Sequence, residues 1–202
     1  MSLKNLFIVS LLFFMVISCA KKAEKAPLIP NNVSLPAGLL EILKTEFSDY
    51  TYLTHFTGNI DTDAVEEVVL VVEGFCNETQ ESASEESKCR LTAFLKPQTN
   101  KGYVVMATNS EVIGCSNCGG AGVGDPGVDI QIMNGKVRFT SMYGGSTKTI
   151  VEEMFTYDSP VKKWKKTRLK TKWYRMDDTL ANGEIKNHVK IQTPKDFGEV
   201  YF

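Results

Sequence analysis

The sequence lacks the features that mark several classes of protein. Its 202 residues include two histidines, carry a formal net charge of −1 and contain no nucleophile-elbow or zinc-protease motif. A balanced charge argues against a dedicated nucleic-acid-binding protein. His55 and His188 stand alone, and nothing around them indicates a Ser-His-Asp arrangement. We therefore expect no nucleic-acid partner, no catalytic residue and no organic cofactor.

A hydrophobic run long enough to span a membrane is also missing. The apolar stretch Leu6–Ile17 follows Lys4 and is shorter than the roughly 20 residues that a spanning helix needs. It ends just before Cys19, as in a bacterial lipoprotein signal. We expect residues 1–18 to be a cleaved signal peptide and Cys19 to carry lipid. Because Ala20 replaces the aspartate of an inner-membrane retention signal, the outer membrane is favoured, with its periplasmic and surface faces both left open.

The remainder of the chain has the composition of one globular domain. Hydrophobic residues make up 43% of the sequence, which is typical of a folded protein. We expect residues 19–33 to form a lipidated, flexible tether and residues 34–202 a single β-rich domain. A short helix opens this domain, with Ser34 as its N-cap and Pro36 in its first turn. Its apolar stripe consists of Leu39, Ile42, Leu43 and Phe47.

Strand patterns dominate from about residue 51 onward. Val65–Phe75 is rich in β-branched residues and continuous enough to be buried on both faces. Asn134-Gly135 separates two strand patterns and predicts a two-residue type I′ hairpin. The other predicted strands are Arg90–Lys96, Gly102–Thr108, Val128–Met133, Lys136–Tyr143, Thr149–Tyr157, Lys163–Tyr174 and one around His188–Gln192. Short connections predict a mainly β fold, an antiparallel meander that is either sandwich-like or propeller-like, with one short N-terminal helix.

Four cysteines remain once Cys19 is lipidated. In an oxidising compartment an even number favours disulfides, and we prefer the pairs Cys76–Cys89 and Cys115–Cys118. A structural zinc site is the alternative, but only the second pair has the tight Cys-x2-Cys spacing. Redox catalysis by Cys115 and Cys118 has weaker support, because no strand-to-helix context surrounds them.

An acidic segment precedes the Val65–Phe75 strand. Asn59, Asp61, Asp63 and Glu67 present oxygen ligands at the spacing of a calcium-binding loop. Ala64 stands where such a loop usually has glycine, which weakens the match. The segment is thus either a calcium site or an acidic turn that leads into a strand.

Two further segments are candidate binding sites. Gly122, Gly124 and Gly127 form a Gly-x-Gly-x-x-Gly pattern, but Pro126 and a strand follow it instead of a helix, so nucleotide binding is not expected. We expect a tight loop there that is also available for interaction. The second segment is the strand at 163–174, whose alternate positions predict either a basic strip for anionic glycans and headgroups or a solvated sheet face. The strip would consist of Lys166, Arg168, Lys170 and Lys172.

Several of these motifs together resemble a widespread group of bacterial exported proteins and lipoproteins without an assigned activity. The resemblance rests on Cys118-Gly119-Gly120, Gly124-Asp125-Pro126, Tyr143-Gly144-Gly145-Ser146, Phe155-Thr156-Tyr157 with Trp164, and Thr193-Pro194-Lys195-Asp196-Phe197-Gly198. The acidic segment at 59–67 resembles the Asp-rich turn of integrin-type propeller repeats. The resemblance implies a β-rich fold and no catalytic residue.

The sequence therefore predicts a lipid-anchored cell-envelope protein that acts as a binding or structural module. Its expected partners are the membrane, through the anchor, and an envelope or host macromolecule. A surface-exposed adhesin and a hydrolase of envelope polymers are the alternative functions.

Overall fold

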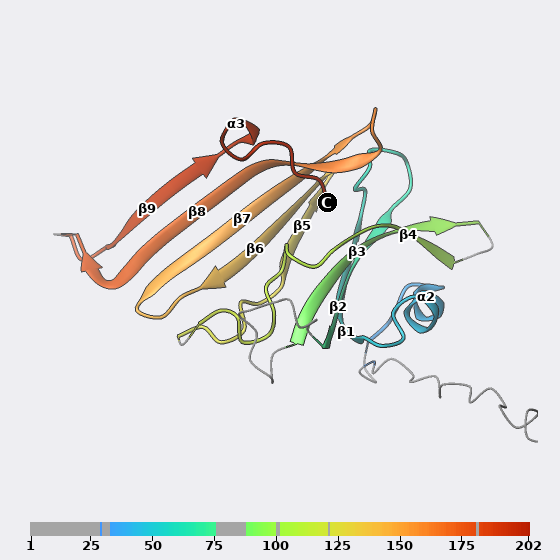
Figure 1. Ribbon diagram of the computed structural model, residues 1–202, viewed down its shortest axis with the longest axis horizontal. Coiled ribbons are helices and arrows are strands. Elements are labelled where there is room, and N and C mark those ends of the chain that lie inside the picture. The colour runs from blue at the N-terminus through green and yellow to red at the C-terminus, as the bar shows by residue number, and fades with distance from the viewer. Residues whose placement is uncertain (1–28, 30–32, 76–87, 100–101, 121, 181) are drawn as a thin grey trace, which may run out of the picture.

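The computed structural model describes residues 29, 33–75, 88–99, 102–120, 122–180 and 182–202. In these residues the chain is mainly β and forms two antiparallel sheets, each of which follows the order of the sequence (Figure 1). The sheets pack as a sandwich over part of their area. The predicted antiparallel meander is confirmed, and its arrangement is sandwich-like.

The first sheet contains β1 (Thr51–Gly58), β2 (Glu67–Phe75), β3 (Lys88–Gln98) and β4 (Gly102–Asn109). Strand β2 is buried on both faces, as its continuous apolar run predicts. Val69 and Val71 face the second sheet, whereas Val68, Leu70 and Val72 face a separate cluster beneath the helix α2 (Leu39–Thr45). This strand therefore belongs to two hydrophobic cores at once.

Helix α2 (Leu39–Thr45) covers the outer face of the first sheet. Ser34 does not cap it; the N-cap is Gly38, with φ of 84° and no side-chain cap. The start of the helix is set by a close approach to β4, because a Cβ on Gly38 would lie 2.7 Å from the Cα of Gly102. Phe47 lies beyond the helix but is buried in the same cluster, as the apolar stripe predicts.

The second sheet contains β5 (Asp129–Met133), β6 (Lys136–Tyr143), β7 (Thr147–Asp158), β8 (Lys163–Thr179) and β9 (Ile185–Gln192). Strands β5 and β6 form the predicted hairpin, but the prediction of a type I′ turn is wrong. Gly135 has φ of 68°, whereas Asn134 is not among the residues with positive φ, and type I′ needs both. The Gly135 N–H donates to the Asn59 carbonyl (3.1 Å) and its carbonyl accepts from Tyr157 N–H (2.8 Å). Contacts with other parts of the fold thus select this turn.

Aromatic rings fill the core between the two sheets. The Phe94 ring lies edge-on to Trp164, with centroids 4.7 Å apart, and stacks on Phe202 at 3.8 Å. The last residues reach this core by pairing with the start of β8, where Phe202 N–H donates to the Trp164 carbonyl (2.8 Å). The C-terminal ring therefore closes one end of the core.

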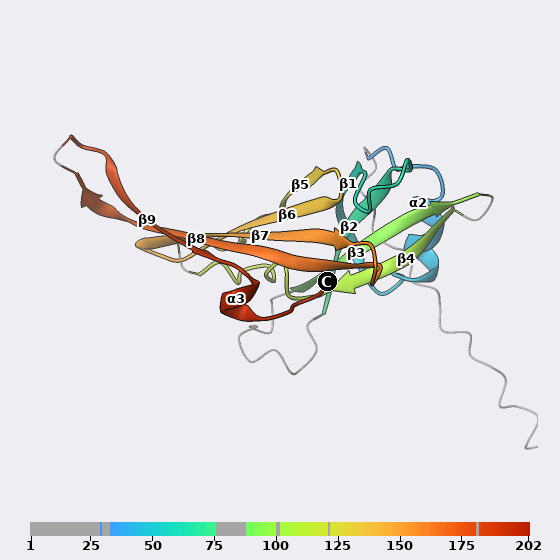
Figure 2. The ribbon, with the colours of Figure 1, turned by 90° about the horizontal axis from the view of Figure 1, so that it is seen from above.

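Only part of the second sheet is covered by the first. Its buried core residues come from β5, the start of β6, the end of β7 and the start of β8: Ile130, Val137, Phe139, Phe155 and Trp164. Beyond them the sheet projects past the first sheet, as seen from above (Figure 2). Side chains on β9 are exposed there, Val189 at 53% and Ile191 at 55%. We call the part formed by 147–154, 168–179 and β9 the projecting sheet.

A short helix, α3 (Pro194–Phe197), follows β9 and begins with a capping box between Thr193 and Asp196. The sequence patterns do not predict this helix. Among the described residues, no helix is long and apolar enough to cross a membrane.

Candidate functional site

The acidic turn ahead of β2 brings three of the four predicted calcium ligands together. Oxygens of Asp61, Asp63 and Glu67 lie within 4.8 Å of one another. The Asn59 side chain is turned to the loop's own backbone, where its amide donates to the Asp63 carbonyl and its oxygen accepts from Thr62 N–H (2.7 Å). Asn59 thus shapes the turn and stands apart from the carboxylate cluster.

Lys96 of β3 supplies the positive charge of this cluster. Its ammonium lies 2.6 Å from Asp61 Oδ2 and 3.4 Å from Glu67 Oε1, and it also donates to Asp63. Burial disfavours the charged ammonium, but the hydrogen bonds to Asp61 and Asp63 outweigh burial and raise the pKa of Lys96. The same lysine hydrogen bond lowers the pKa of Asp63.

Glu67 is the innermost member of the acidic cluster. It is fully buried, and its Oε2 accepts the Ile60 N–H at 2.9 Å. Its Oε1 has only the ion-pair approach of Lys96 and accepts no hydrogen bond. Burial raises the pKa of Glu67, and the negative charge of Asp61 raises it further.

These contacts bear on what the acidic turn can bind. Lys96 donates to or approaches all three carboxylates, so a divalent cation at this position would have to displace the ammonium. The turn is also built into the fold, because the Ile60 carbonyl accepts the Trp164 indole N–H at 2.6 Å. Calcium binding stays a prediction. The cluster ties the turn to β3 within the first sheet, and the hydrogen bond from Trp164 to Ile60 ties the same turn to the second sheet.

The glycine-rich segment 115–127 is a pinned loop. Cys115 and Cys118 form a disulfide with Cα atoms 5.1 Å apart, so the pair offers no thiolates to a zinc ion. Cys89 is also disulfide-bonded, while Cys76 lies outside the described residues. The segment leads into the strand β5 rather than a helix, which agrees with the expectation that it does not cradle a nucleotide.

A buried arginine that sequence analysis missed holds this loop. Arg90 of β3 is 4% exposed; it donates to the carbonyls of Gly114 (3.4 Å) and Gly127 (3.2 Å) and pairs with Asp125. The hydrogen bond that Arg90 donates to Asp125 lowers the pKa of the Asp125 carboxyl group. Lone Arg and Asp residues 35 positions apart carry no local signal, so only the fold reveals the pair. A cavity of about 330 Å³ adjoins Arg90, the Cys115–Cys118 disulfide and Tyr143.

The predicted basic strip is divided by a bulge in β8. Met154 pairs with Arg168 and Phe155 with Lys166, so Thr167 is an extra residue in the ladder. Lys166 therefore lies on the face that carries Phe155; its ammonium is 2.9 Å from Glu153 and 5.6 Å from the Phe155 ring centroid. The alternation expected for a regular strand is wrong at this point, because a bulge reverses the side-chain direction.

The other three cations of the strip remain together on the opposite face. Arg168 is exposed, Lys170 pairs with Glu152 at 2.7 Å, and Lys172 lies over the Tyr174 ring. This outer face is not covered by the first sheet. It is the part of the predicted strip that a partner could reach.

The two histidines have structural neighbours. Tyr52 hydroxyl and His55 Nδ1 share a hydrogen bond of 2.8 Å, and burial lowers the pKa of His55. The His188 ring stacks on Trp173 in the projecting sheet, with centroids 5.5 Å apart. Neither contact is that of a catalytic base with an orienting carboxylate.

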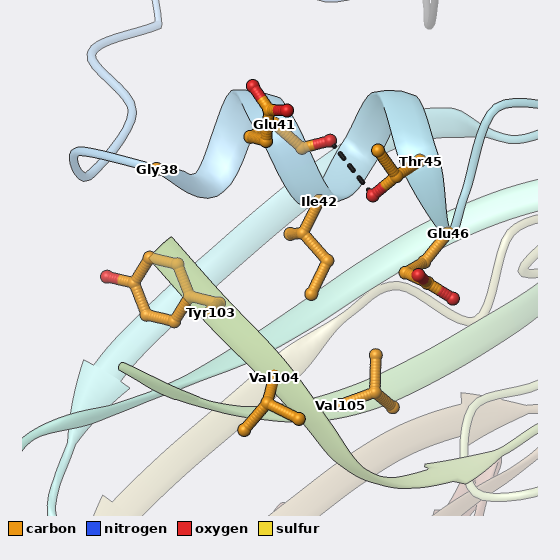
Figure 3. Close-up of a pocket in the computed structure, with 8 residues that line it drawn as sticks. All are labelled: Gly38, Glu41, Ile42, Thr45, Glu46, Tyr103, Val104 and Val105. Carbon is orange, nitrogen blue, oxygen red and sulfur yellow. Dashed lines mark hydrogen bonds between the residues drawn. The ribbon is translucent and has the colours of Figure 1, made fainter. Parts of the chain in front are cut away.

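A groove lies between α2 and the edge of the first sheet (Figure 3). It has a volume of about 320 Å³, with Tyr103, Val104 and Val105 of β4 on one side and α2 on the other. The helix contributes Gly38, Glu41, Ile42, Thr45 and Glu46. Sequence analysis did not predict this groove, because it depends on how a helix sits beside a strand far along the chain.

Comparisons with models of known protein families, with curated proteins and with solved structures returned no match for this chain. The resemblance to exported bacterial proteins therefore stays a prediction.

Proposed function

We propose that this protein is a lipid-anchored binding module of the bacterial cell envelope. The lipoprotein pattern that ends at Cys19 supports the anchor, although Cys19 lies outside the described residues. A disulfide-pinned loop suits an oxidising compartment. The side chains at the candidate sites are engaged in holding the fold, which favours binding over catalysis.

The projecting sheet is the observation that carries this proposal. Its outer face combines cations with exposed aliphatic side chains, because Lys170 pairs across the ladder with Ile191 and Lys172 with Val189. Arg168 extends the positive row. Cross-strand partners share one face, so each aliphatic group has a lysine beside it. An anionic partner that also has apolar groups fits such a surface.

Binding of vesicles tests the proposal. The mature chain without lipid is titrated with phosphatidylglycerol vesicles and, in parallel, phosphatidylcholine vesicles. We expect preference for the anionic vesicles, and we expect both Arg168→Glu/Lys172→Glu and Val189→Ser/Ile191→Ser to weaken binding. Lys44→Glu on α2 is a single charge reversal at a distant site and serves as the control; it should bind like the wild type. Equal binding by all four proteins would reject the projecting sheet as the contact surface.

The side of the outer membrane on which the partner lies needs a separate measurement. Protease added to intact cells removes a domain that faces outward and leaves a periplasmic domain intact. Removal would direct the search to extracellular macromolecules, in agreement with an adhesin. Protection until the membrane is breached would exclude the adhesin and leave envelope components as partners.

A further inference from the structure

Strand β4 is an edge of the first sheet without charged or proline protection, and a bulge at Met106 interrupts its register with β3. It is the last strand in the sheet order, and its sequence Gly-Tyr-Val-Val-Met-Ala-Thr-Asn contains no charge and no proline. Native sheets usually blunt such edges with lysine, proline or inward charges. The edge strand β9 of the second sheet follows this rule, because it carries Lys186 and Lys190. The regular part of β4 before the bulge, 102–105, presents backbone groups to which another strand can pair.

Helix α2 forms the second wall of a groove along this edge. The helix begins in contact with β4, where Gly38 packs against Gly102, and then runs beside the strand (Figure 3). Buried Ile42 lies at the base of the groove, and Tyr103 and Val105 are half-buried along the strand. An extended peptide paired to β4 would therefore place alternate side chains against an apolar wall, as in strand addition beside a helix.

The helix side of the groove is acidic. Glu41 and Glu46 are exposed and line it, and the lining described for the groove includes no lysine or arginine. Lys44 lies on the same helix but does not line the groove. Complementary charge fixes the register and the choice of partner more than it adds affinity. The groove thus selects a peptide with cationic side chains on the helix side.

We propose that the groove between α2 and β4 binds an extended, lysine- or arginine-bearing segment of a partner protein, which adds to the first sheet beside β4. The chain's own tether is a poor occupant, because Pro27 and Pro30 cannot donate ladder hydrogen bonds. A second copy paired through β4 would bring two acidic rims together, which disfavours it. This inference concerns a different surface from the projecting sheet, so the two can fail independently.

Synthetic peptides test the proposal directly. The probes are acetylated, amidated Thr-Lys-Val-Lys-Val-Lys-Thr, its counterpart with glutamate for lysine, and a lysine peptide with proline in place of both valines. We expect the wild-type protein to bind the lysine peptide about tenfold more tightly than the glutamate peptide, the scale of one or two rim charge pairs. The proline peptide should not bind, and bound lysine peptide should slow amide hydrogen exchange in β4.

Charge reversal on the helix separates this site from general electrostatics. The double variant Glu41→Lys/Glu46→Lys should prefer the glutamate peptide, because both rim charges have changed sign. Glu184→Lys, a single charge reversal in the β8–β9 turn, is the control at a distant site and should keep the wild-type preference. No binding of the lysine peptide by the wild type, an unchanged preference in the double variant, or an equal loss in the control would each overturn the proposal. Arg168→Glu/Lys172→Glu should bind the lysine peptide normally, which keeps this test apart from the vesicle experiment.

Discussion

The two sheets of this protein are built for different tasks. The first sheet is buried on both faces, by α2 on one side and by the second sheet on the other, and β2 contributes to both cores. The second sheet is buried only where it meets the first, and its projecting part leaves Val189 and Ile191 exposed. Since buried apolar area is the main source of stability, the first sheet holds the fold. The exposed side chains of the projecting sheet are not needed for the core, so they can differ without loss of the fold.

The largest expected effect comes from deleting a core ring and comparing it with a truncation on the projecting sheet. Phe94 is fully buried and stacks with aromatic rings from both the second sheet and the C-terminus. Phe94→Ala should lower the free energy of unfolding by about 3–5 kcal/mol. Ile191→Ala, at an exposed site, should change it by about 0.5 kcal/mol or less. Denaturant unfolding of the two variants measures the difference.

A loss of unfolding free energy for Ile191→Ala close to the loss for Phe94→Ala would contradict the view that the first sheet supplies most of the stability. It would mean that the projecting sheet is covered in solution, for example by a second copy. The oligomeric state of the wild type, measured by sedimentation, would then show whether self-association covers the projecting sheet. A monomer would mean that the projecting sheet itself contributes to stability as the first sheet does.

Removing the charge of Lys96 should have the next largest effect. Lys96→Met leaves Glu67 fully buried beside Asp61, with no ion pair to a cation among the described residues. Stranding a buried charge typically costs about 3–5 kcal/mol; Lys96 is 28% exposed and Asp63 is exposed, so we expect about 2–3 kcal/mol. Denaturant unfolding measures this loss, with Lys170→Met on the second sheet as the matched control.

Calcium sharpens the same experiment. Once Lys96 is removed, the three carboxylates have no ion pair with a cation among the described residues, and millimolar calcium should restore part of the lost stability. Wild-type protein should gain less, because its ammonium competes for the same oxygens. Equal gains in both proteins would show that the lysine does not occupy the position of the predicted calcium ion.

Buried Glu67 of the first sheet should make the free energy of unfolding depend on pH. Burial raises its pKa above the ordinary value of 4.5, so the folded state binds its proton more tightly than the unfolded chain does. The contribution to stability is therefore complete below about pH 4.5 and is lost as the pH rises through the folded pKa. Each unit of upward shift corresponds to about 1.4 kcal/mol. Unfolding measured from acidic to neutral pH should show the wild type losing stability relative to Glu67→Gln.

Parallel pH curves for the wild type and Glu67→Gln would show that Glu67 keeps its ordinary pKa.

Asp125 gives a pH dependence of stability of the opposite sign, because the hydrogen bond from Arg90 lowers the pKa of its carboxyl group. Its contribution is present above the ordinary value of 3.8 and is lost as the pH falls through the lowered pKa. The two effects occupy different pH ranges, so they can be separated in one titration.

Local patterns in the sequence predict the strands well and the site poorly. The apolar run at 65–75 predicts a doubly buried strand because burial on both faces removes the alternation of polar residues. The bulge at Thr167 and the turn at Asn134 leave no local pattern, so the placement of Lys166 on the same face as the other cations and the type I′ turn were predicted incorrectly. The partnership of Lys96 with Asp61, 35 residues apart, depends on strand pairing. The acidic cluster is visible in the sequence, but the cation that neutralises it is not.

The smallest effect concerns the ion pair between Lys170 and Glu152 on the projecting sheet. Both side chains are more exposed than Glu67, at 26% and 22%, and their 2.7 Å contact lies on the outer face. A double-mutant cycle with Lys170→Met and Glu152→Gln should give a coupling energy of about 0.2–1 kcal/mol, because solvent screens partly exposed pairs. The corresponding cycle with Lys96→Met and Glu67→Gln should give a larger value, since water cannot screen a fully buried carboxylate. Coupling energies of equal size would show that burial does not separate the two sheets electrostatically, and the difference in function that we assign to them would lose its physical basis.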